Sequence, residues 1–288
     1  MALTEDFTFK LGDSGVVLNT DAIYPFVDAE NVKGLDSAPF RTSSRDHEGD
    51  EGGFMDAEFE KGRDIVIDGT AYATTDGMED FLDQLKANWA PSKVQVPFYF
   101  KPPGKNERML LVKPLGMRYD WSTMRRTNQV SIQLGAFAED PRIYDSTLIN
   151  VNLPLGATVF SGFGFNVSFP FGFGGVSTTA DAIQIVNTGN RPTPPVITIH
   201  GPCDNPRLLN DTVSKEMLFQ GLSLGGSDTL VVDMKNRTAK LNGTTNRRNT
   251  LVAPTWFNLE VGANTLRFRA SSSDPSAFAT VSYRPAWR

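Results

Sequence analysis

The chain has 288 residues, of which 40% are hydrophobic and 21% charged, as is typical of a globular protein with about two domains. Its one cysteine excludes an intramolecular disulfide framework, and together with two histidines it excludes a Cys/His zinc site. The net charge of −5 gives no global basic field, so we expect no specific nucleic-acid binding.

Membrane and export signals are also missing from the sequence. No stretch approaches the roughly 18 consecutive apolar residues of a membrane span. The first residues, MALTEDFTFK, lack the basic and apolar regions of a secretory signal. We therefore expect synthesis in a cytoplasm and no membrane insertion.

The charges are divided unevenly along the chain. Residues 1–145 carry a net charge of −9, residues 146–175 carry no charged side chain, and residues 176–288 carry +4. An uncharged strip between two oppositely charged segments indicates a domain boundary. We predict an N-terminal domain over 1–145, a Phe/Gly-rich linker over 146–175 and a C-terminal domain over 176–288.

The N-terminal segment contains runs that are typical of strands, because β-branched and aromatic residues alternate between turn signals. These runs are Thr4–Leu11, Phe54–Phe59, Asp64–Tyr72, Val94–Phe100, Met109–Met117 and Gln129–Phe137.

One amphipathic helix is predicted over residues 76–89. Apolar residues recur there at helical spacing, from Met78 to Trp89. Thr75 and Asp76 offer N-cap oxygens, and Pro91 ends the helix. We expect it to lie on a sheet.

The segment Arg41–Gly53, RTSSRDHEGDEGG, is predicted to be a protruding loop that becomes ordered on assembly. It resembles a calcium loop, but its sixth and twelfth positions are Glu51 and Ala57 where such a loop has Gly and Glu. We therefore predict no metal site. The segment is then a solvated charge run, a weak cation contact or a salt-bridging interface with a partner, and the candidate interface residues are Asp46, Glu48, Asp50 and Glu51.

A phenylalanine-rich strip, FSGFGFNVSFPFGF, covers residues 160–173. It can be a linker leading into the first strand of the second domain. It can also be a contact strip against a partner, because contiguous exposed apolar surface is rare on monomers. The candidate contact residues are Phe163, Phe165, Phe169, Phe171 and Phe173.

The C-terminal segment reads as strands and turns at a spacing of about ten residues, which indicates a β-sandwich or jelly roll. The predicted strands are Ala182–Val186, Pro195–His200, Arg207–Asn210, Glu216–Phe219, Thr229–Asp233, Thr238–Leu241, Trp256–Leu259, Asn264–Arg269 and Ala279–Tyr283. The fold class is therefore mainly β, with two β-sandwich-like domains of which the first carries the helix.

No catalytic constellation is found. Ser223 lies in GLSLG, which spells a nucleophile elbow, but a strand pattern and no histidine follow it. Cys203 lies three residues after His200 without an orienting third group. We predict neither an enzyme nor a cofactor.

The basic pair Arg247–Arg248 ends the turn LNGTTNRRN. It is either a solvated loop or a docking contact for an acidic neighbour.

Several stretches together resemble the distal tail protein family of long-tailed, non-contractile phages. They are GRDIVIDG (62–69) with the helix after it, SIQLGAFAEDPRIYD (131–145), and DTLVVDMKNRTAKLNGTTNRR (228–248) continuing to WFNLEVGANTLRF (256–268). The resemblance implies a structural virion protein of the phage tail tip, synthesised in the host cytoplasm. It implies an N-terminal domain that assembles into a hexameric ring and a C-terminal sandwich similar to galectins or carbohydrate-binding modules.

The same resemblance implies partners: the tail tube protein, the tail-tip hub protein and receptor-binding proteins. The alternative is a lectin-like tail protein that contacts glycans of the host cell wall. For that function Trp256 is the candidate residue for stacking on a sugar, unless it packs inside the sandwich.

Overall fold

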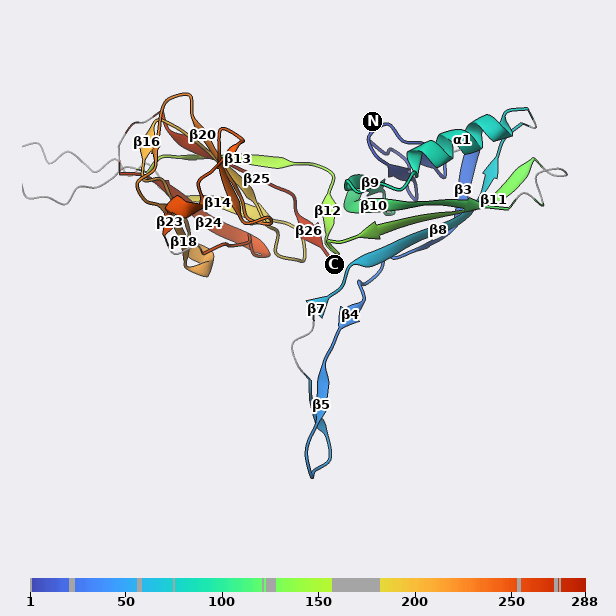
Figure 1. The fold of residues 1–288 in the computed structure, drawn as a ribbon, viewed down its shortest axis with the longest axis horizontal. Helices are drawn as coiled ribbons and strands as arrows, with labels where there is room; N and C mark the ends of the chain where they lie inside the picture. The colour runs from blue at the N-terminus through green and yellow to red at the C-terminus, as the bar shows by residue number, and fades with distance from the viewer. Residues whose placement is uncertain are drawn as a thin grey trace, which may run out of the picture. The chain divides into compact units, whose positions relative to one another are not determined.

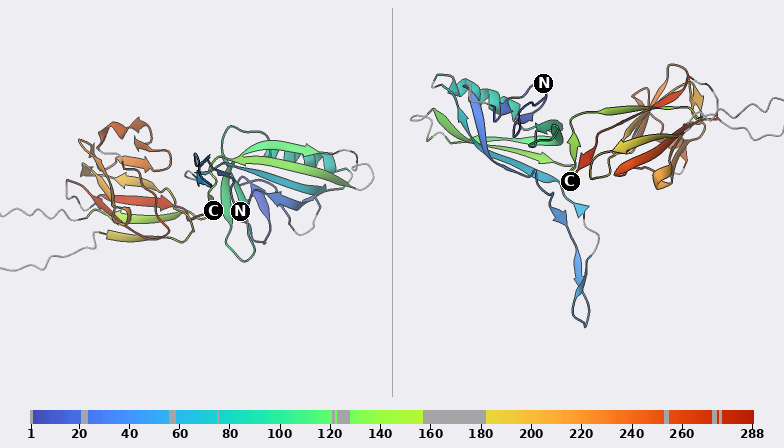
Figure 2. Two further views of the ribbon diagram at one scale, coloured as in Figure 1. Left: turned by 90° about the horizontal axis from the view of Figure 1, so that it is seen from below. Right: turned by 180° about the vertical axis from the view of Figure 1, so that it is seen from behind.

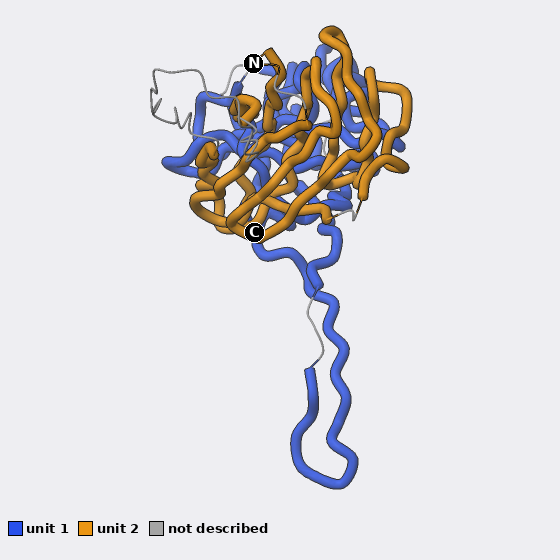
Figure 3. Tube along the Cα trace, turned by 90° about the vertical axis from the view of Figure 1, so that its left-hand side faces the viewer, with its two compact units in different colours: residues 1–146, 287–288 blue, residues 147–286 orange. Residues whose placement is uncertain are grey.

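A computed structural model describes residues 2–20, 24–55, 59–74, 76–120, 122, 128–156, 182–252, 255–271, 274 and 276–288. Over these ranges the chain is mainly β, as predicted, with a single α-helix. It forms two compact units (Figure 3). Unit 1 comprises Met1–Ser146 and Trp287–Arg288, and unit 2 comprises Thr147–Ala286.

Unit 1 is built on a nine-stranded sheet with the order β2-β1-β9-β10-β11-β8-β3, in which β12 also pairs with β10 and β26 with β12. Its strands are β1 (Phe9–Leu11), β2 (Val17–Leu18), β3 (Phe26–Lys33), β8 (Arg63–Tyr72), β9 (Val96–Phe100), β10 (Arg108–Tyr119), β11 (Gln129–Ala138), β12 (Ile143–Asp145) and β26 (Ala286–Trp287).

The longest register joins β8 to β11, from Arg63 opposite Ala138 to Tyr72 opposite Gln129. Side chains alternate along β8, so that Ile65, Ile67 and Ala71 are buried while Asp64, Val66 and Asp68 are more exposed. The predicted strands Asp64–Tyr72 and Gln129–Phe137 agree with β8 and β11 to within one residue.

The edge strand β3 was not predicted from the sequence. Only Val27 of its eight residues is buried, so its sequence lacks the apolar alternation of a half-buried strand. It pairs with β8 around Gly69, where a Cβ atom would lie 2.3 Å from the carbonyl oxygen of Asp28. Glycine at position 69 therefore permits the close approach of β3.

Helix α1 (Met78–Asn88) covers one face of this sheet (Figure 1). Its buried side chains are Met78, Phe81, Leu82 and Leu85, as the periodicity predicts. The predicted N-cap was wrong: the cap is Gly77, which provides no side-chain hydrogen bond, and Thr75 lies outside the described residues. Eleven residues are too few to span a bilayer, and the described residues contain no helix that could do so.

A two-stranded arm leaves the sheet between β3 and β8 (Figures 1 and 3). We call residues 40–60 the arm. In it β4 (Phe40–Arg41) pairs with β7 (Phe59–Glu60), and β5 (Ser44–Asp46) pairs with β6 (Gly53–Met55). The predicted loop over 41–53 is therefore a hairpin. Its sequence lacks the apolar alternation of a strand because neither face of the hairpin is buried.

Arg63 lies directly after the arm and is almost fully buried, with 1% of its surface exposed. Its Nη1 donates hydrogen bonds to the carbonyl oxygens of Gly34, at 3.1 Å, and Asp36, at 2.8 Å, just before the arm. Burial lowers the pKa of Arg63, while the charges of Asp36 and Asp140 oppose that shift. Asp140 in turn accepts a hydrogen bond from Tyr144 Oη at 2.7 Å.

Unit 2 contains two antiparallel sheets that face each other (Figure 2). The six-stranded sheet contains β13 (Ile149–Pro154), β25 (Phe278–Tyr283), β15 (Val196–His200), β20 (Thr229–Asp233), β21 (Thr238–Leu241) and β22 (Thr245–Asn246). The five-stranded sheet contains β14 (Ala182–Asn187), β24 (Gly262–Arg269), β17 (Arg207–Asn210), β18 (Lys215–Phe219) and β23 (Leu251–Val252).

Short elements complete unit 2. They are the strand pair β16 (Cys203–Asp204) and β19 (Ser223–Leu224), and the 3₁₀ turns η1 (Asp211–Val213) and η2 (Arg248–Thr250). One continuous cluster of buried side chains, including Ile197, Phe219 and Phe268, lies between the sheets.

The predicted linker 146–175 was wrong at its beginning, because Ile149–Pro154 is strand β13. The outer face of β13 carries the uncharged polar residues Asn150 and Asn152. Thr280 Oγ1 donates a hydrogen bond to Asn152 Oδ1 at 3.0 Å, and Ser282 Oγ donates one to Asn150 Oδ1 at 2.7 Å. An uncharged strand of this kind has the composition of a linker.

The predicted strand Trp256–Leu259 was also wrong. Phe257 and Leu259 do turn inward together, but Leu259 forms only an isolated bridge with Thr193. The alternation of apolar residues correctly predicted that Phe257 and Leu259 share a face. It did not predict a strand correctly, because this segment is not paired along its length with a neighbouring strand.

Cys203 is buried in unit 2, with 2% of its surface exposed. Burial and the neighbouring carboxylate of Asp204 raise the pKa of its thiol to about 11. It therefore packs as a small apolar side chain.

Replacing Arg63 by Met leaves the carbonyls of Gly34 and Asp36 without their buried donor. We expect Arg63→Met to lower the free energy of unfolding of unit 1 by about 2–5 kcal/mol, because two hydrogen bonds from a charged donor, each worth about 1.5–3 kcal/mol, are lost. The measurement is the urea concentration at which the backbone amides of β8 lose half of their protection from hydrogen exchange. The control Arg118→Met removes an exposed arginine from β10 and is expected to cost less than about 0.5 kcal/mol. Equal losses in the two variants would contradict a special role of Arg63.

Cys203 is expected to react with iodoacetamide at pH 8 at least about 100-fold more slowly in the folded chain than in urea. Two pKa units between its ordinary value of 9.0 and about 11 reduce the thiolate a hundredfold. Mass spectrometry of the alkylated peptides measures both rates. Lys240→Cys, at an exposed position of β21, provides the fast-reacting control. Labelling of Cys203 as fast as the control would show that its thiol is accessible to solvent in the folded chain.

Candidate functional site: the arm and the arginine face

The arm exposes large apolar side chains. The exposed fractions are 46% for Phe40, 63% for Phe54, 62% for Met55 and 57% for Phe59. A lone two-stranded ribbon is marginally stable in water, because it buries little apolar surface. Docking on another surface would bury these side chains and stabilise the arm.

Few contacts within the arm cover these side chains. The ring of His47 lies 4.1 Å from that of Phe54, measured between centroids, and the guanidinium of Arg41 lies 5.7 Å from the centroid of Phe59. Cation–π and aromatic contacts of this kind contribute about 0.5–1.5 kcal/mol each, less than burial of the rings.

The arm tip, residues 45–51, carries four carboxylates and one arginine. The predicted interface residues Asp46, Glu48, Asp50 and Glu51 are all exposed and are brought together here. The turn is closed by the bond from His47 N to Gly52 O at 3.0 Å and by that from Glu51 N to Asp50 Oδ1 at 2.8 Å. The tip therefore presents a compact acidic surface.

Unit 2 carries a surface that the sequence analysis missed, the outward side of the five-stranded sheet. We call it the arginine face and define it by Arg207 on β17 and by Arg267 and Arg269 on β24. Arg207 lies directly opposite Arg269, and Arg267 opposite Leu209. The alternation in LRFR (266–269), with arginines between buried Leu266 and Phe268, was the signal that could have revealed it.

Two arginines of this face are held in place by carboxylates. Arg207 binds Glu216 through Nε–Oε1 at 2.5 Å and Nη2–Oε2 at 2.6 Å, and Arg267 Nε binds Asp211 Oδ2 at 2.6 Å. The pKa of Arg207 is raised by its hydrogen bond to Glu216. Because a guanidinium has five N–H donors, one carboxylate does not exhaust it.

Apolar side chains lie among the arginines. Leu218 pairs with Arg207 across β17 and β18, and Val252, 46% exposed, pairs with Leu218 from the other side. The face therefore offers both cationic and aliphatic contacts, a combination enriched in protein interfaces.

Arg247 and Arg248 lie near this sheet, with Arg248 opening η2 just before β23. Arg248 is exposed, and its guanidinium lies 5.9 Å from the ring centroid of Trp256. Trp256 is partly buried against the core, so its ring is less available for stacking on a sugar than an exposed one. Glycan stacking at Trp256 stays a prediction.

Of the remaining candidates, Phe163, Phe165, Phe169, Phe171 and Phe173 lie outside the described residues. Ser223 donates a hydrogen bond to the carboxylate of Asp204, within β19 and β16, and not to a histidine. Within the described ranges no three His, Cys, Asp or Glu side chains are grouped so that they could hold a metal ion.

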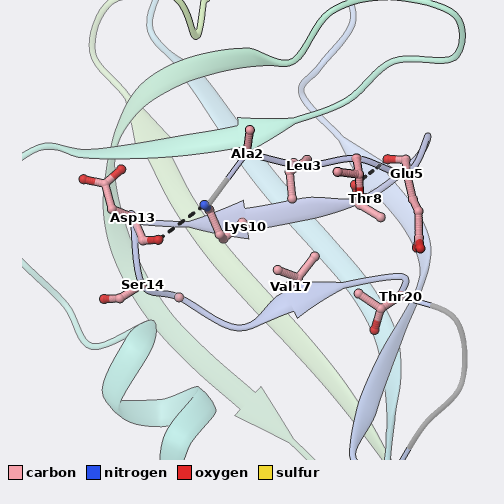
Figure 4. Close-up of a pocket in the computed structure, with 11 residues that line it drawn as sticks. Ala2, Leu3, Glu5, Thr8, Lys10, Asp13, Ser14, Val17 and Thr20 are labelled. Atoms are coloured by element: carbon pink, nitrogen blue, oxygen red, sulfur yellow. Dashed lines mark hydrogen bonds between the residues drawn. The ribbon is translucent and has the colours of Figure 1, made fainter.

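A hollow of about 370 Å³ lies between the N-terminal residues and the hairpin of β1 and β2 (Figure 4). Lys10, 4% exposed, donates from Nζ to the carbonyl oxygen of Asp13 at 3.4 Å and lies 4.9 Å from the ring centroid of Tyr99. Glu5 and Asp13 also line the hollow, so its lining mixes both signs of charge and specifies no class of ligand.

Comparisons with known proteins agree with the architecture. Residues 188–287 match the siphovirus-type tail component family, C-terminal domain. No curated protein sequence matches the chain.

Among solved structures, the chain is similar to the Dit protein of phage SPP1, described as a paradigm of the hub adsorption apparatus in phages that infect Gram-positive bacteria. That match has a TM-score of 0.66 and 14% identity and covers 99% of this chain and 100% of that one. A chain of the phage P2 baseplate, in its activated conformation with Ca, matches with a TM-score of 0.52 and 10% identity over 96% of this chain and 98% of that one.

At these identities the structural likeness establishes the fold, and the match of residues 188–287 establishes the family of unit 2. The predicted resemblance is confirmed: residues 188–287 match the siphovirus-type tail component family, and the chain is similar in fold to the Dit protein of phage SPP1.

Proposed function

We propose that this protein of the virion tail tip self-assembles through unit 1 into a ring, expected to be hexameric, that joins the tail tube to the tail-tip hub. The observation that carries the proposal is the arm, whose exposed Phe and Met side chains need a docking surface. A closed ring requires heterologous contacts, in which one patch of a chain meets a different patch of the next. A projecting arm supplies one such patch.

The proposed partners follow the same logic. The ring stacks on the tail tube protein and the tail-tip hub protein, and unit 2 is available to receptor-binding proteins. The likeness to hub and baseplate proteins supports this role. The protein acts as a scaffold rather than an enzyme.

The alternative, lectin-like binding of host-wall glycans through unit 2, has weaker support. Partial burial of Trp256 and the guanidinium of Arg248 beside its ring favour a structural role for that tryptophan. Glycan-array binding by a chain that remains monomeric would favour the alternative.

We expect a species of about six times the 31.6 kDa chain mass in sedimentation velocity or light scattering, either alone or with the tube and hub proteins. The double variant Phe54→Ser, Met55→Ser is expected to remain folded and to lose this species. The reason is that two exposed apolar side chains, worth roughly 1.5–3 kcal/mol each when buried, no longer dock.

Val94→Ser serves as the matched control, because Val94 is 73% exposed in unit 1 outside the arm. Assembly is expected to be unchanged in this variant. A chain that stays monomeric with both partners present, or an arm variant that assembles like the wild type, would overturn the proposed mode of assembly.

A further inference from the structure

We propose that the acidic arm tip of one copy docks on an uncompensated cationic surface at the β21–β22 end of unit 2 in a second copy. We call this surface the basic edge and define it by Arg237, Lys240, Arg247 and Arg248. The inference rests on the proposed self-assembly and goes beyond it by naming the two surfaces that meet.

Backbone pairing brings the cations of the basic edge together. Lys240 lies opposite Asn246 across β21 and β22, and the N–H of Arg247 donates to the carbonyl oxygen of Ala239 at 2.8 Å. Arg237 directly precedes β21, and Arg248 opens η2. The sequence from 235 to 248 contains five bases and no acid, so no acidic residue lies among these cations along the chain.

The charges of the basic edge are not compensated by its own unit. Among the residues that the structure describes, none of its four side chains forms an ion pair with a carboxylate. The arginine face differs in this respect, because Glu216 binds Arg207 and Asp211 binds Arg267. Charge therefore selects the basic edge, and not the arginine face, as the surface of unit 2 that attracts an acidic partner.

Two arginines of the basic edge retain hydrogen-bond donors. The Nε atom of Arg247 is buried and has no hydrogen-bond partner in the described part of the chain. The guanidinium of Arg248 lies 5.9 Å from the ring centroid of Trp256. Stacking of this kind uses the face of the guanidinium, while its five N–H donors lie in the plane. A carboxylate can therefore bind Arg248 in a forked geometry without displacing Trp256.

The arm tip is the matching anionic surface. Asp46 and Glu48 are exposed, and neither forms an ion pair within the described ranges. The first turn of α1 is also acidic, but α1 lies on the sheet, whereas the arm projects from it (Figure 1). The arm also adds exposed Phe54 and Met55 beside its carboxylates. Because exposed ion pairs alone contribute little, this apolar surface favours the arm over α1 as the occupant.

A second copy of the chain supplies the arm tip in the right proportion. Every copy carries one arm tip and one basic edge, so the two surfaces are present in equal number. Two arm tips repel each other, as do two basic edges, so that unlike patches meet. Such a contact is heterologous, as a closed ring requires.

Site-directed cross-linking between two chains tests the contact directly. One chain carries Ser44→Cys, an exposed position of β5 that leaves all four tip carboxylates in place. The other carries Asn249→Cys, exposed on η2 beside Arg248. The control partner carries Gln184→Cys, exposed on β14 at the opposite edge of the five-stranded sheet from β23. A short bis-maleimide joins the thiols, and the buried Cys203 contributes little background.

We expect peptides joined through positions 44 and 249 at least about tenfold more often than through 44 and 184. Raising the salt concentration from about 0.1 M to about 1 M shortens the screening length from about 10 Å to about 3 Å. The yield at position 249 is therefore expected to fall at least about tenfold in high salt.

Charge reversal identifies the groups that meet. Adding Glu48→Lys to the arm chain is expected to lower the yield at least about tenfold, and Arg248→Glu in the partner chain to restore part of it. Asp80→Lys in the first turn of α1 changes the net charge equally and is expected to leave the yield unchanged. Rescue by opposite charges distinguishes a docking contact from a folding defect.

Equal yields at positions 249 and 184, or an equal loss with Asp80→Lys and Glu48→Lys, would overturn this docking. If the mass of that sample shows oligomers, the proposed self-assembly stays intact. A chain with both Ser44→Cys and Asn249→Cys that cross-links as a monomer would place the contact inside one copy and also overturn it. A sample that stays monomeric with tube and hub proteins added would overturn both proposals.

Discussion

The buried guanidinium of Arg63 is the constraint on which the organisation of unit 1 depends. A charge with 1% exposure is tolerated only when neighbouring groups compensate its lost hydration. Here Nη1 donates hydrogen bonds to the carbonyl oxygens of Gly34 and Asp36, and the charges of Asp36 and Asp140 oppose the fall in the pKa of Arg63. The compensation is partial, since Nε and Nη2 are buried without a hydrogen-bond partner among the described residues. One side chain thereby fixes the chain before the arm to the strand after it. Because Arg63 also begins β8, the arm has a rigid root in the sheet.

The arm and the rest of unit 1 therefore differ in how much apolar surface they bury. The body is complete by itself, since α1 buries its apolar side chains on the sheet, with Trp89 against Phe98. The arm has paired backbone groups but leaves Phe54 and Met55 largely in water. Burial of these side chains against another surface would therefore stabilise the arm further.

What could be predicted from the sequence follows from which residues are buried. Strand β8 and helix α1 were predicted because one face of each is buried, and burial imposes a period of two or 3.6 residues. Edge strand β3, the arm hairpin and β13 were missed because their pairing is not accompanied by that period. The acidic tip was recognised as a charge run, but its hairpin geometry was not. The arginine face could be recognised only from the register that places Arg207 opposite Arg269. Local sequence does not specify which distant strands pair.

The uneven charge of the chain gains a structural meaning from these surfaces. The acidic excess of residues 1–145 includes the arm tip, and the basic excess of residues 176–288 includes the basic edge. Charges held on separate units of one chain favour contacts between unlike patches and oppose contacts between identical ones. In the proposed assembly, attraction between unlike charges would raise the rate of encounter, and burial of Phe54 and Met55 would slow dissociation. For the proposed ring such selectivity would matter, because heterologous contacts in a wrong register generate open filaments instead of a closed ring.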